Sequence, residues 1–167
     1  MILDSGDRTE FKSGAVRDIK TENGRCDLLP LDTISEVFEM SIPKWIDKYQ
    51  RTGDTGNLVT ALKEFIDCAY IDDEIYKNNE PIGRWCTAML DLSIHYKEGA
   101  EKYEENNWKK GIPCKSYIDS AMRHYFKWLR GDEDEHHERA FMWNIIGCIW
   151  TEKEMPELGV KGSGVRV

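Results

Sequence analysis

The chain has 167 residues, 40% hydrophobic and 32% charged, which indicates one globular domain with a buried core and excludes a fibrous or low-complexity protein. Its net charge of -8 argues against a general nucleic-acid binder, because a phosphate backbone attracts a basic surface. The chain has no CxxC pair, so we expect neither a zinc knuckle nor a disulfide framework. It also has no apolar run close to the about 20 residues of a membrane span, so we expect a cytoplasmic location and no membrane partner.

The first half of the chain predicts an irregular arm followed by short helices. Residues 1 to about 31 are polar and interrupted by glycines, so we expect an arm without regular structure that docks on the rest of the protein. Helices are predicted over 32–39, from Pro43 onward, and over 58–69, where apolar residues recur with the i, i+3, i+4 spacing of a helix face. A break is predicted at 78–81.

The second half predicts three longer helices. The first covers 82–103, and its flank carries a line of ionisable groups at helical spacing, namely Asp91, His95, Glu98 and Lys102. The next starts near Ser116 and ends before Gly131, a residue type common at helix C-termini. No stretch alternates polar and apolar residues for long enough to predict a strand. We therefore expect an all-α protein, an antiparallel bundle of four to five main helices in one domain over 1–158, with a flexible tail over 159–167.

The last predicted helix, 135–151, is apolar around most of its circumference except for one narrow polar stripe. At about 100° per residue, the stripe consists of His137, Ala140, Asn144, Gly147 and Thr151. Such a helix must be buried on several sides, and an unpaired polar group in a core costs about 1 to 3 kcal/mol. The polar stripe is therefore predicted to face either a polar network or a ligand cleft.

All four histidines lie in the second half of the chain, on helices that also carry carboxylates. Facing helices of a bundle commonly build metal sites from inward carboxylates and imidazoles, so Glu98, Glu135 and His137 are candidate ligands. Any one acid can equally be a solvated surface group, and Glu135 can simply complement the helix dipole. His136 points away from the polar stripe and is expected to be solvated.

Several basic residues could hold phosphate oxygens: Arg17, Arg25, Lys102, Lys109, Arg123 and Arg139. Most lysines and arginines only confer solubility, and Arg123 can pair with Asp119 four residues earlier on the same helix. The motifs HExxH, GxxxxGK[ST] and GxSxG do not occur, nor does the adjacent His-Asp pair of HD phosphohydrolases. The sequence thus excludes those enzyme classes.

Four sequence blocks together resemble a known family. They are SGAVRD at 13–18, GRCDLLPLD at 24–32, HYKEGAEKYEENNWKKGIP at 95–113 and IDSAMRHYFKWLRGDEDEHHERAFMWN at 118–144. In this order they are similar to the phage and prophage family of dATP/dGTP diphosphohydrolases, amino-terminal type, over about residues 13 to 158. The segment from about 35 to 84 resembles a helical insertion that some members carry.

That family is in turn similar to the all-α, MazG-like NTP pyrophosphohydrolases. The resemblance implies hydrolysis of (d)NTP to (d)NMP and pyrophosphate with Mg²⁺ or Mn²⁺, in the host cytoplasm if the chain is phage-encoded. MazG-like enzymes hold the metal with ExxE and ExxD motifs, of which this chain has no faithful copy, and His137 or Glu138 stands where a carboxylate is expected. One alternative is a nucleotide-binding protein without catalysis, for example one that sequesters a signalling nucleotide. Another is a structural protein whose polar stripe satisfies itself in the core.

For the enzyme, each candidate residue has a predicted role. The metal ligands are Glu98, Glu135 and His137, and the catalytic residues are His124 and Glu138. The substrate would contact Trp108 and Asn144 with its base, and its phosphates would be held by Arg25, Lys102, Arg123 and Arg139. A homo-oligomer is expected, because helical hydrolases of this size tend to complete a cleft with a neighbouring subunit, and the aromatic-rich segment 45–65 could supply that interface.

Overall fold

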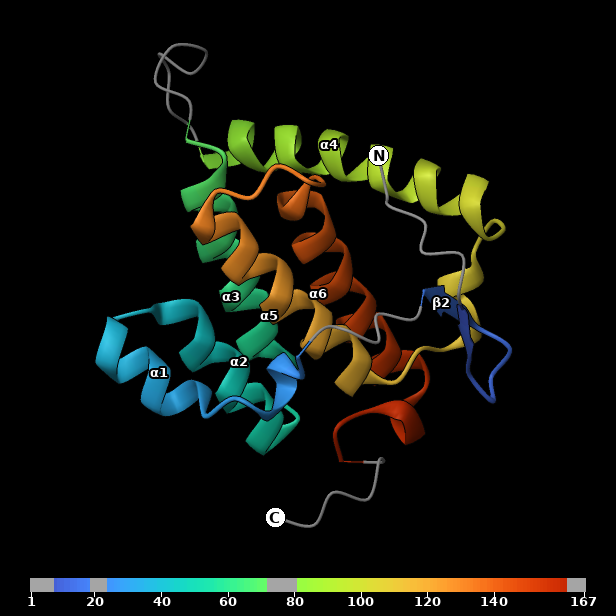
Figure 1. The fold of residues 1–167 in the computed structure, drawn as a ribbon, viewed down its shortest axis with the longest axis horizontal. Helices are drawn as coiled ribbons and strands as arrows, with labels where there is room; N and C mark the ends of the chain where they lie inside the picture. The colour runs from blue at the N-terminus through green and yellow to red at the C-terminus, as the bar shows by residue number, and fades with distance from the viewer. Residues whose placement is uncertain (1–7, 19–23, 72–80, 162–167) are drawn as a thin grey trace.

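The computed structural model describes residues 8–18, 24–71 and 81–161, and these residues are mainly helical (Figure 1). They form six α-helices: α1 (Leu31–Phe38), α2 (Ser41–Thr52), α3 (Thr55–Ala69), α4 (Pro81–Lys102), α5 (Cys114–Arg130) and α6 (His137–Glu154). Three short 3-10 helices accompany them: η1 (Cys26–Leu28), η2 (Asn107–Lys110) and η3 (Pro156–Leu158). The predicted all-α class is confirmed, with one short helix and five longer ones in the described part of the chain.

Helices α5 and α6 form the centre of the protein, with α4 lying along one side of the pair (Figure 1). α5 ends at Gly131, which adopts a positive φ of 80° and donates its backbone N–H to the carbonyls of Lys127 and Trp128, as its sequence predicts. The short acidic turn that follows reverses the chain into α6. The predicted starts differ from the observed ones by about one half turn, since α5 begins at Cys114 and α6 at His137.

The segment between 35 and 84 contributes to the same core. Phe65 of α3 is fully buried, and its ring centroid lies 4.2 Å from that of Phe141 on α6 and 5.1 Å from that of Trp128 on α5. Tyr49 of α2 is also fully buried and donates its hydroxyl to Glu152 Oε1 at 2.6 Å. These two aromatic side chains are therefore not available to a subunit interface, contrary to what the sequence suggests.

The amino-terminal arm contains a small antiparallel sheet where no strand is predicted. Strand β1 (Arg8–Glu10) pairs with β2 (Val16–Asp18) in the register Arg8↔Asp18, Thr9↔Arg17 and Glu10↔Val16. Gly14 takes a positive φ of 82° in the connecting turn, a conformation that glycine adopts without steric cost. Strands of three residues are too short to produce a recognisable alternation, which explains why the sequence does not predict them.

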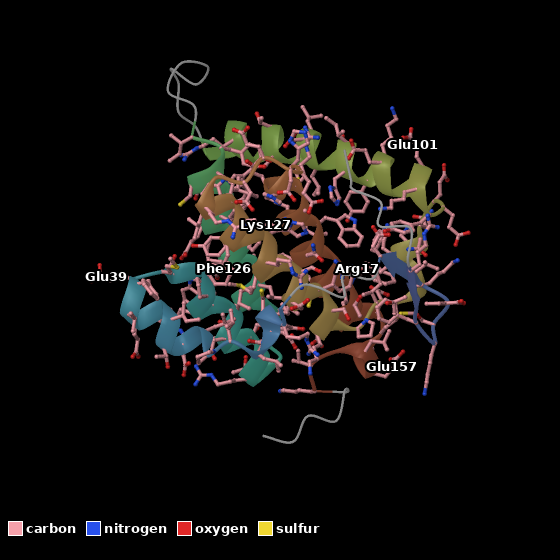
Figure 2. The ribbon with its side chains drawn as sticks, in the orientation of Figure 1. Arg17, Glu39, Glu101, Phe126, Lys127 and Glu157 are labelled. Atoms are coloured by element: carbon pink, nitrogen blue, oxygen red, sulfur yellow. The ribbon has the colours of Figure 1, made fainter. Side chains whose placement is uncertain are left out.

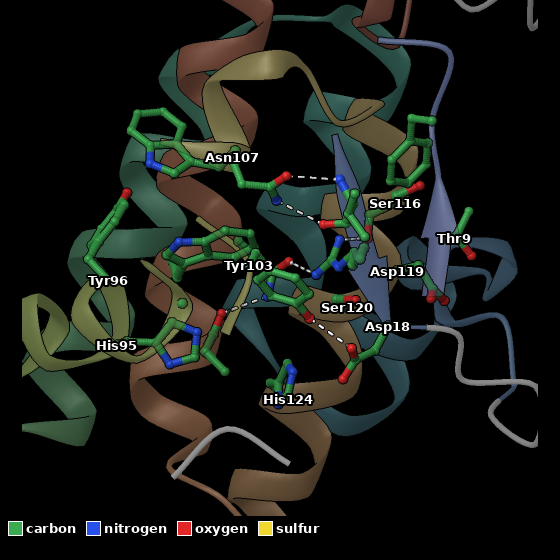
Figure 3. A pocket seen from close by; sticks show the side chains of 18 of the residues that line it. Thr9, Asp18, His95, Tyr96, Tyr103, Asn107, Ser116, Asp119, Ser120 and His124 are labelled. Atoms are coloured by element: carbon green, nitrogen blue, oxygen red, sulfur yellow. Dashed lines mark hydrogen bonds between the residues drawn. The ribbon is translucent and has the colours of Figure 1, made fainter. Parts of the chain in front are cut away.

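This β1–β2 hairpin docks on the loop after α4, as expected for the arm. The side-chain amide of Asn107 accepts from Val16 N at 3.0 Å and donates to Val16 O at 2.8 Å (Figure 3). The Ser13 hydroxyl donates to the Gly111 carbonyl, and Ala15 is fully buried. These contacts fix the position of β2, and with it the two residues that follow Val16.

The first residues after η3 pack against α6. Val160 donates its backbone N–H to Glu152 Oε1 at 2.8 Å, so the predicted tail is docked over its first residues. Residues 162–167 of that tail and residues 78–80 of the predicted break lie outside the described part of the chain. Among the described helices, none has the length and apolar character needed to cross a membrane.

Candidate functional site

A cavity of about 750 Å³ lies between the β1–β2 hairpin, α4, the η2 loop, α5 and α6 (Figure 3). Its volume is in the usual range of small-molecule sites, about 300–1,000 Å³. The polar stripe of α6 contributes Ala140 and Asn144 to the wall, and His124 of α5 and His95 of α4 line it from the neighbouring helices. Part of the polar stripe thus faces a cavity, while His137 and Asn144 also take part in polar networks within the protein.

Asn144, in the middle of the polar stripe, holds an arginine from the amino-terminal hairpin. Its Oδ1 accepts a hydrogen bond from Arg17 Nη2 at 2.5 Å, and its Nδ2 donates to the Ala140 carbonyl at 2.7 Å. Arg17 Nη1 donates to the Ser116 carbonyl of α5 at 3.0 Å. Because both ends of its amide are engaged, Asn144 here positions Arg17 at the cavity wall, whereas the sequence suggests contact with a base.

A cluster of two imidazoles and a carboxylate lies at the start of α6. His137 is 1% exposed, and its Nδ1 lies 3.0 Å from Nδ1 of His124. Glu135 Oε1 lies 3.4 Å from His124 Nδ1 and 3.9 Å from His137 Nδ1. The other ring nitrogen of His137, Nε2, lies 2.9 Å from Asp134 Oδ1. A neutral His137 that donates from Nε2 to Asp134 directs its Nδ1 lone pair toward His124 and Glu135.

The His124–Glu135–His137 cluster could hold a metal ion. The three ligand atoms define a triangle whose circumscribed circle has a radius of about 2.0 Å, close to a metal–nitrogen bond length. Two imidazole nitrogens and one carboxylate oxygen suit Mn²⁺ or another transition-metal dication better than Mg²⁺, which prefers oxygen ligands. Asp134 on the far nitrogen of His137 is the usual support for a ligating histidine. A hydrogen bond from Lys127 lowers the pKa of Asp134, which favours the carboxylate form.

The four predicted phosphate-binding residues all have carboxylate partners. Arg25 pairs with Asp27 at 2.5 Å, Lys102 with Asp18 at 2.6 Å, and Arg139 with Asp91 at 2.5 Å, while Arg123 pairs with Asp119. Only Arg25 and Arg123 of these four line the cavity. The charges of these four residues are thus already balanced within the protein. For Arg123, the partner is Asp119, the residue that the helical spacing predicts.

The remaining predicted residues divide between the cavity and its surroundings. Trp108 lines the cavity, with its ring edge-on to Tyr96 and Trp150 at centroid distances of 5.7 and 5.0 Å. Glu98 and Glu138 do not line it, and neither belongs to the His124–Glu135–His137 cluster. The structure therefore brings together Glu135 and His137 of the predicted metal ligands, adds His124 to them, and places Glu98 elsewhere.

Burial sets the charge of a further cavity residue, His95. Its pKa falls to about 4, mainly because burial disfavours the imidazolium, and the charges of Arg139 and Arg17 act in the same direction while that of Glu98 opposes them. The His95 ring centroid lies 5.9 Å from that of Trp143. His95 is therefore neutral near pH 7 and offers hydrogen-bonding atoms without charge.

Comparison with known proteins concerns this same part of the chain. Residues 85–160 match the family model described as dATP/dGTP diphosphohydrolase, N-terminal. Over these residues the chain is similar to that family. No curated protein and no solved structure matches the chain.

The match to the dATP/dGTP diphosphohydrolase family covers the elements that build the cavity and the cluster. It includes all of α5, η2, α6 and η3 and most of α4. The β1–β2 hairpin with Arg17 lies outside the matched residues. Sequence reasoning missed Asp134 as the partner of His137, although the two residues are three apart across the start of a helix, a spacing that brings side chains together.

Proposed function

We propose that the chain is a nucleoside triphosphate diphosphohydrolase that converts dATP, dGTP or a related nucleotide and water to the nucleoside monophosphate and pyrophosphate. The observation that supports this most directly is the His124–Glu135–His137 cluster, which lies within the family match and presents His124 and Glu135 to the cavity. A nucleotide is compatible with the volume of the cavity and with its wall of aromatic and charged side chains.

In this reaction a water oxygen attacks the α-phosphorus, the bond between that phosphorus and the α,β-bridging oxygen breaks, and pyrophosphate leaves with the bonding electron pair. A divalent ion bound by His124, Glu135 and His137 would neutralise phosphate charge and acidify the attacking water. We propose that the Glu135 carboxylate, which lines the cavity beside His124, accepts the proton of that water. Asp134 holds the His137 ring in one tautomer and orientation.

We propose that the base of the nucleotide binds against the aromatic side chains of the cavity wall. Trp108 and Tyr96 line the cavity and offer ring faces and edges for stacking. His95, neutral near pH 7, can donate or accept one hydrogen bond to an uncharged base or sugar. A wall of this kind suits a purine, which presents a large flat surface.

The test is pyrophosphate release from a panel of deoxynucleoside and ribonucleoside triphosphates, with Mn²⁺ and with Mg²⁺. We expect turnover with Mn²⁺, and a loss of at least about 100-fold in kcat for Glu135→Gln and for His137→Ala. His136→Ala is the matched control, because this neighbouring histidine is exposed and does not belong to the cluster. Its activity should equal that of the wild type.

Two results would count against the proposed reaction. One is no turnover of any nucleotide together with tight nucleotide binding in calorimetry, which would identify a nucleotide-binding protein without catalysis. The other is neither turnover nor any shift of the melting temperature by a nucleotide, which would favour a structural role for the polar stripe. Sedimentation of the same samples tests the expected homo-oligomer.

A further inference from the structure

Arg17 differs from every other cation that lines the cavity. Arg25, Lys97, Lys115 and Arg123 each have a carboxylate oxygen within 4.0 Å, from Asp27, Glu101, Asp27 and Asp119 respectively. The hydrogen bonds of Arg17 go instead to two neutral acceptors, the Ser116 carbonyl and Asn144 Oδ1. Within residues 8–18, 24–71 and 81–161, no carboxylate forms an ion pair with Arg17.

Two carboxylates of the cavity wall, those of Asp18 and Asp119, are engaged by other cations. Asp18, the next residue of β2, accepts from Lys102 Nζ at 2.6 Å and from the Tyr103 hydroxyl at 2.9 Å. Asp119 pairs with Arg123 and accepts from Cys26 N at 2.6 Å. Burial lowers the pKa of Arg17, as expected for a cation withdrawn from water. Although the chain has a net charge of -8, the described residues thus provide no counter-ion for the Arg17 guanidinium at the cavity.

The position of Arg17 is nevertheless well defined. Its guanidinium carbon lies 5.6 Å from the centroid of the Tyr117 ring and 5.5 Å from that of Trp143, distances typical of cation–π contacts. Figure 2 shows Arg17 near the middle of the molecule, whereas exposed acids such as Glu39 and Glu101 lie around its outside. The hairpin therefore presents a fixed, planar donor rather than a mobile surface charge.

We propose that Arg17 is the anion-binding residue of the cavity. A phosphate group of the ligand would form the ion pair with Arg17 that no described carboxylate forms. A guanidinium offers several N–H donors in one plane and matches phosphate oxygens. The amino-terminal hairpin is then part of the binding site, although it lies outside the family match. The identity of the ligand as a nucleotide rests on the proposed function, whereas the anion site rests on the contacts of Arg17 alone.

The experiment is calorimetric titration of the full chain with inorganic pyrophosphate, which separates binding from turnover. Arg17→Gln keeps a side-chain donor for Asn144 and removes the charge, and we expect it to weaken pyrophosphate binding by about 10- to 100-fold. Its melting temperature without ligand should be unchanged or higher, because the variant removes a partly buried charge that forms no ion pair with the described residues. Lys97→Gln is the matched control, since it removes a charge from the same cavity that is already paired with Glu101 at 3.7 Å. We expect its affinity to stay within about 2-fold of the wild type.

A second variant keeps the test decisive if Arg17→Gln does not fold. Asn144→Asp places a carboxylate where Asn144 Oδ1 now contacts Arg17 at 2.5 Å, and so supplies the missing counter-ion. We expect it to lose pyrophosphate affinity by a similar factor, and some stability because aspartate cannot donate to the Ala140 carbonyl, while a purely structural Arg17 would leave the affinity unchanged.

The outcomes separate this inference from the proposed reaction. Binding of pyrophosphate that depends on Arg17, without turnover of any nucleotide, would support the anion site and reject the reaction. Turnover with unchanged pyrophosphate affinity in Arg17→Gln and Asn144→Asp would reject the anion site and keep the reaction. No pyrophosphate binding by the wild-type chain would also overturn the anion site.

Discussion

Replacing His95 with glutamine should remove a defined part of the pH dependence of folding. Burial holds the pKa of folded His95 at about 4, below the 6.5 of a solvated imidazole. The unfolded chain therefore binds more protons than the native protein between these two values, so the native state loses stability as the pH falls through this window. From the two pKa values, the free energy of unfolding should drop by about 2 kcal/mol between pH 7 and pH 5 through His95 alone.

The assay is urea unfolding of the wild type and of His95→Gln at pH 7 and pH 5, followed by tryptophan fluorescence. The pH window lies above the ordinary pKa of aspartate and glutamate, so carboxylate protonation contributes little to the difference between the two proteins. We expect the wild type to lose about 2 kcal/mol more than the variant. His136→Gln serves as the control, because that histidine is exposed and should behave as the wild type does. An equal pH dependence in the wild type and His95→Gln, within about 0.5 kcal/mol, would refute the reasoning.

Three further changes test the packing around the site. In Gly147→Ala, the added Cβ would lie 2.6 Å from Cε1 of the buried Tyr117 ring, so we expect a loss of about 1 to 3 kcal/mol in urea unfolding despite the better helix propensity of alanine. Asp18→Asn removes the carboxylate that Lys102 Nζ contacts at 2.6 Å, where both side chains are below 10% exposed, and should cost about 3 kcal/mol, measured in the same way. Phe65→Ala should cost about 3 to 5 kcal/mol and lower the melting temperature, and a smaller loss would indicate that α3 is not part of the core.

Periodicity in the sequence was sufficient to predict the helices and the burial of the polar stripe. Each of α3, α4, α5 and α6 spans several turns, and over that length apolar residues recur often enough to mark a face. Asn144 and His137 are 2% and 1% exposed, so the prediction that polar groups on this helix are buried is confirmed. The spacing of residues along the sequence predicts burial here because a helix determines which side chains share a face.

The sequence could not predict which groups meet across elements. The contact between Arg17 and Asn144 joins residues 127 positions apart, and its donor lies on a strand of three residues that leaves no periodic signal. Likewise Glu135 reaches His124 of α5 only because of the path of the turn after Gly131, which depends on loop geometry rather than on residue type. The pairing of Arg139 with Asp91 depends in the same way on how α4 lies against α6.

The polar stripe of α6 has two separate polar contacts, and their spacing restricts what can bridge them. His137 and Asn144 are seven residues apart, which corresponds to about 10 Å along a helix axis at about 1.5 Å per residue. From this spacing we expect the His124–Glu135–His137 cluster and Arg17 to hold different groups of a ligand rather than the same phosphorus atom. A ligand that contacts both must extend along α6, as a nucleoside triphosphate can and a single orthophosphate cannot. Affinity for a nucleoside triphosphate should then fall when either contact is removed, whereas orthophosphate should respond to only one of the two.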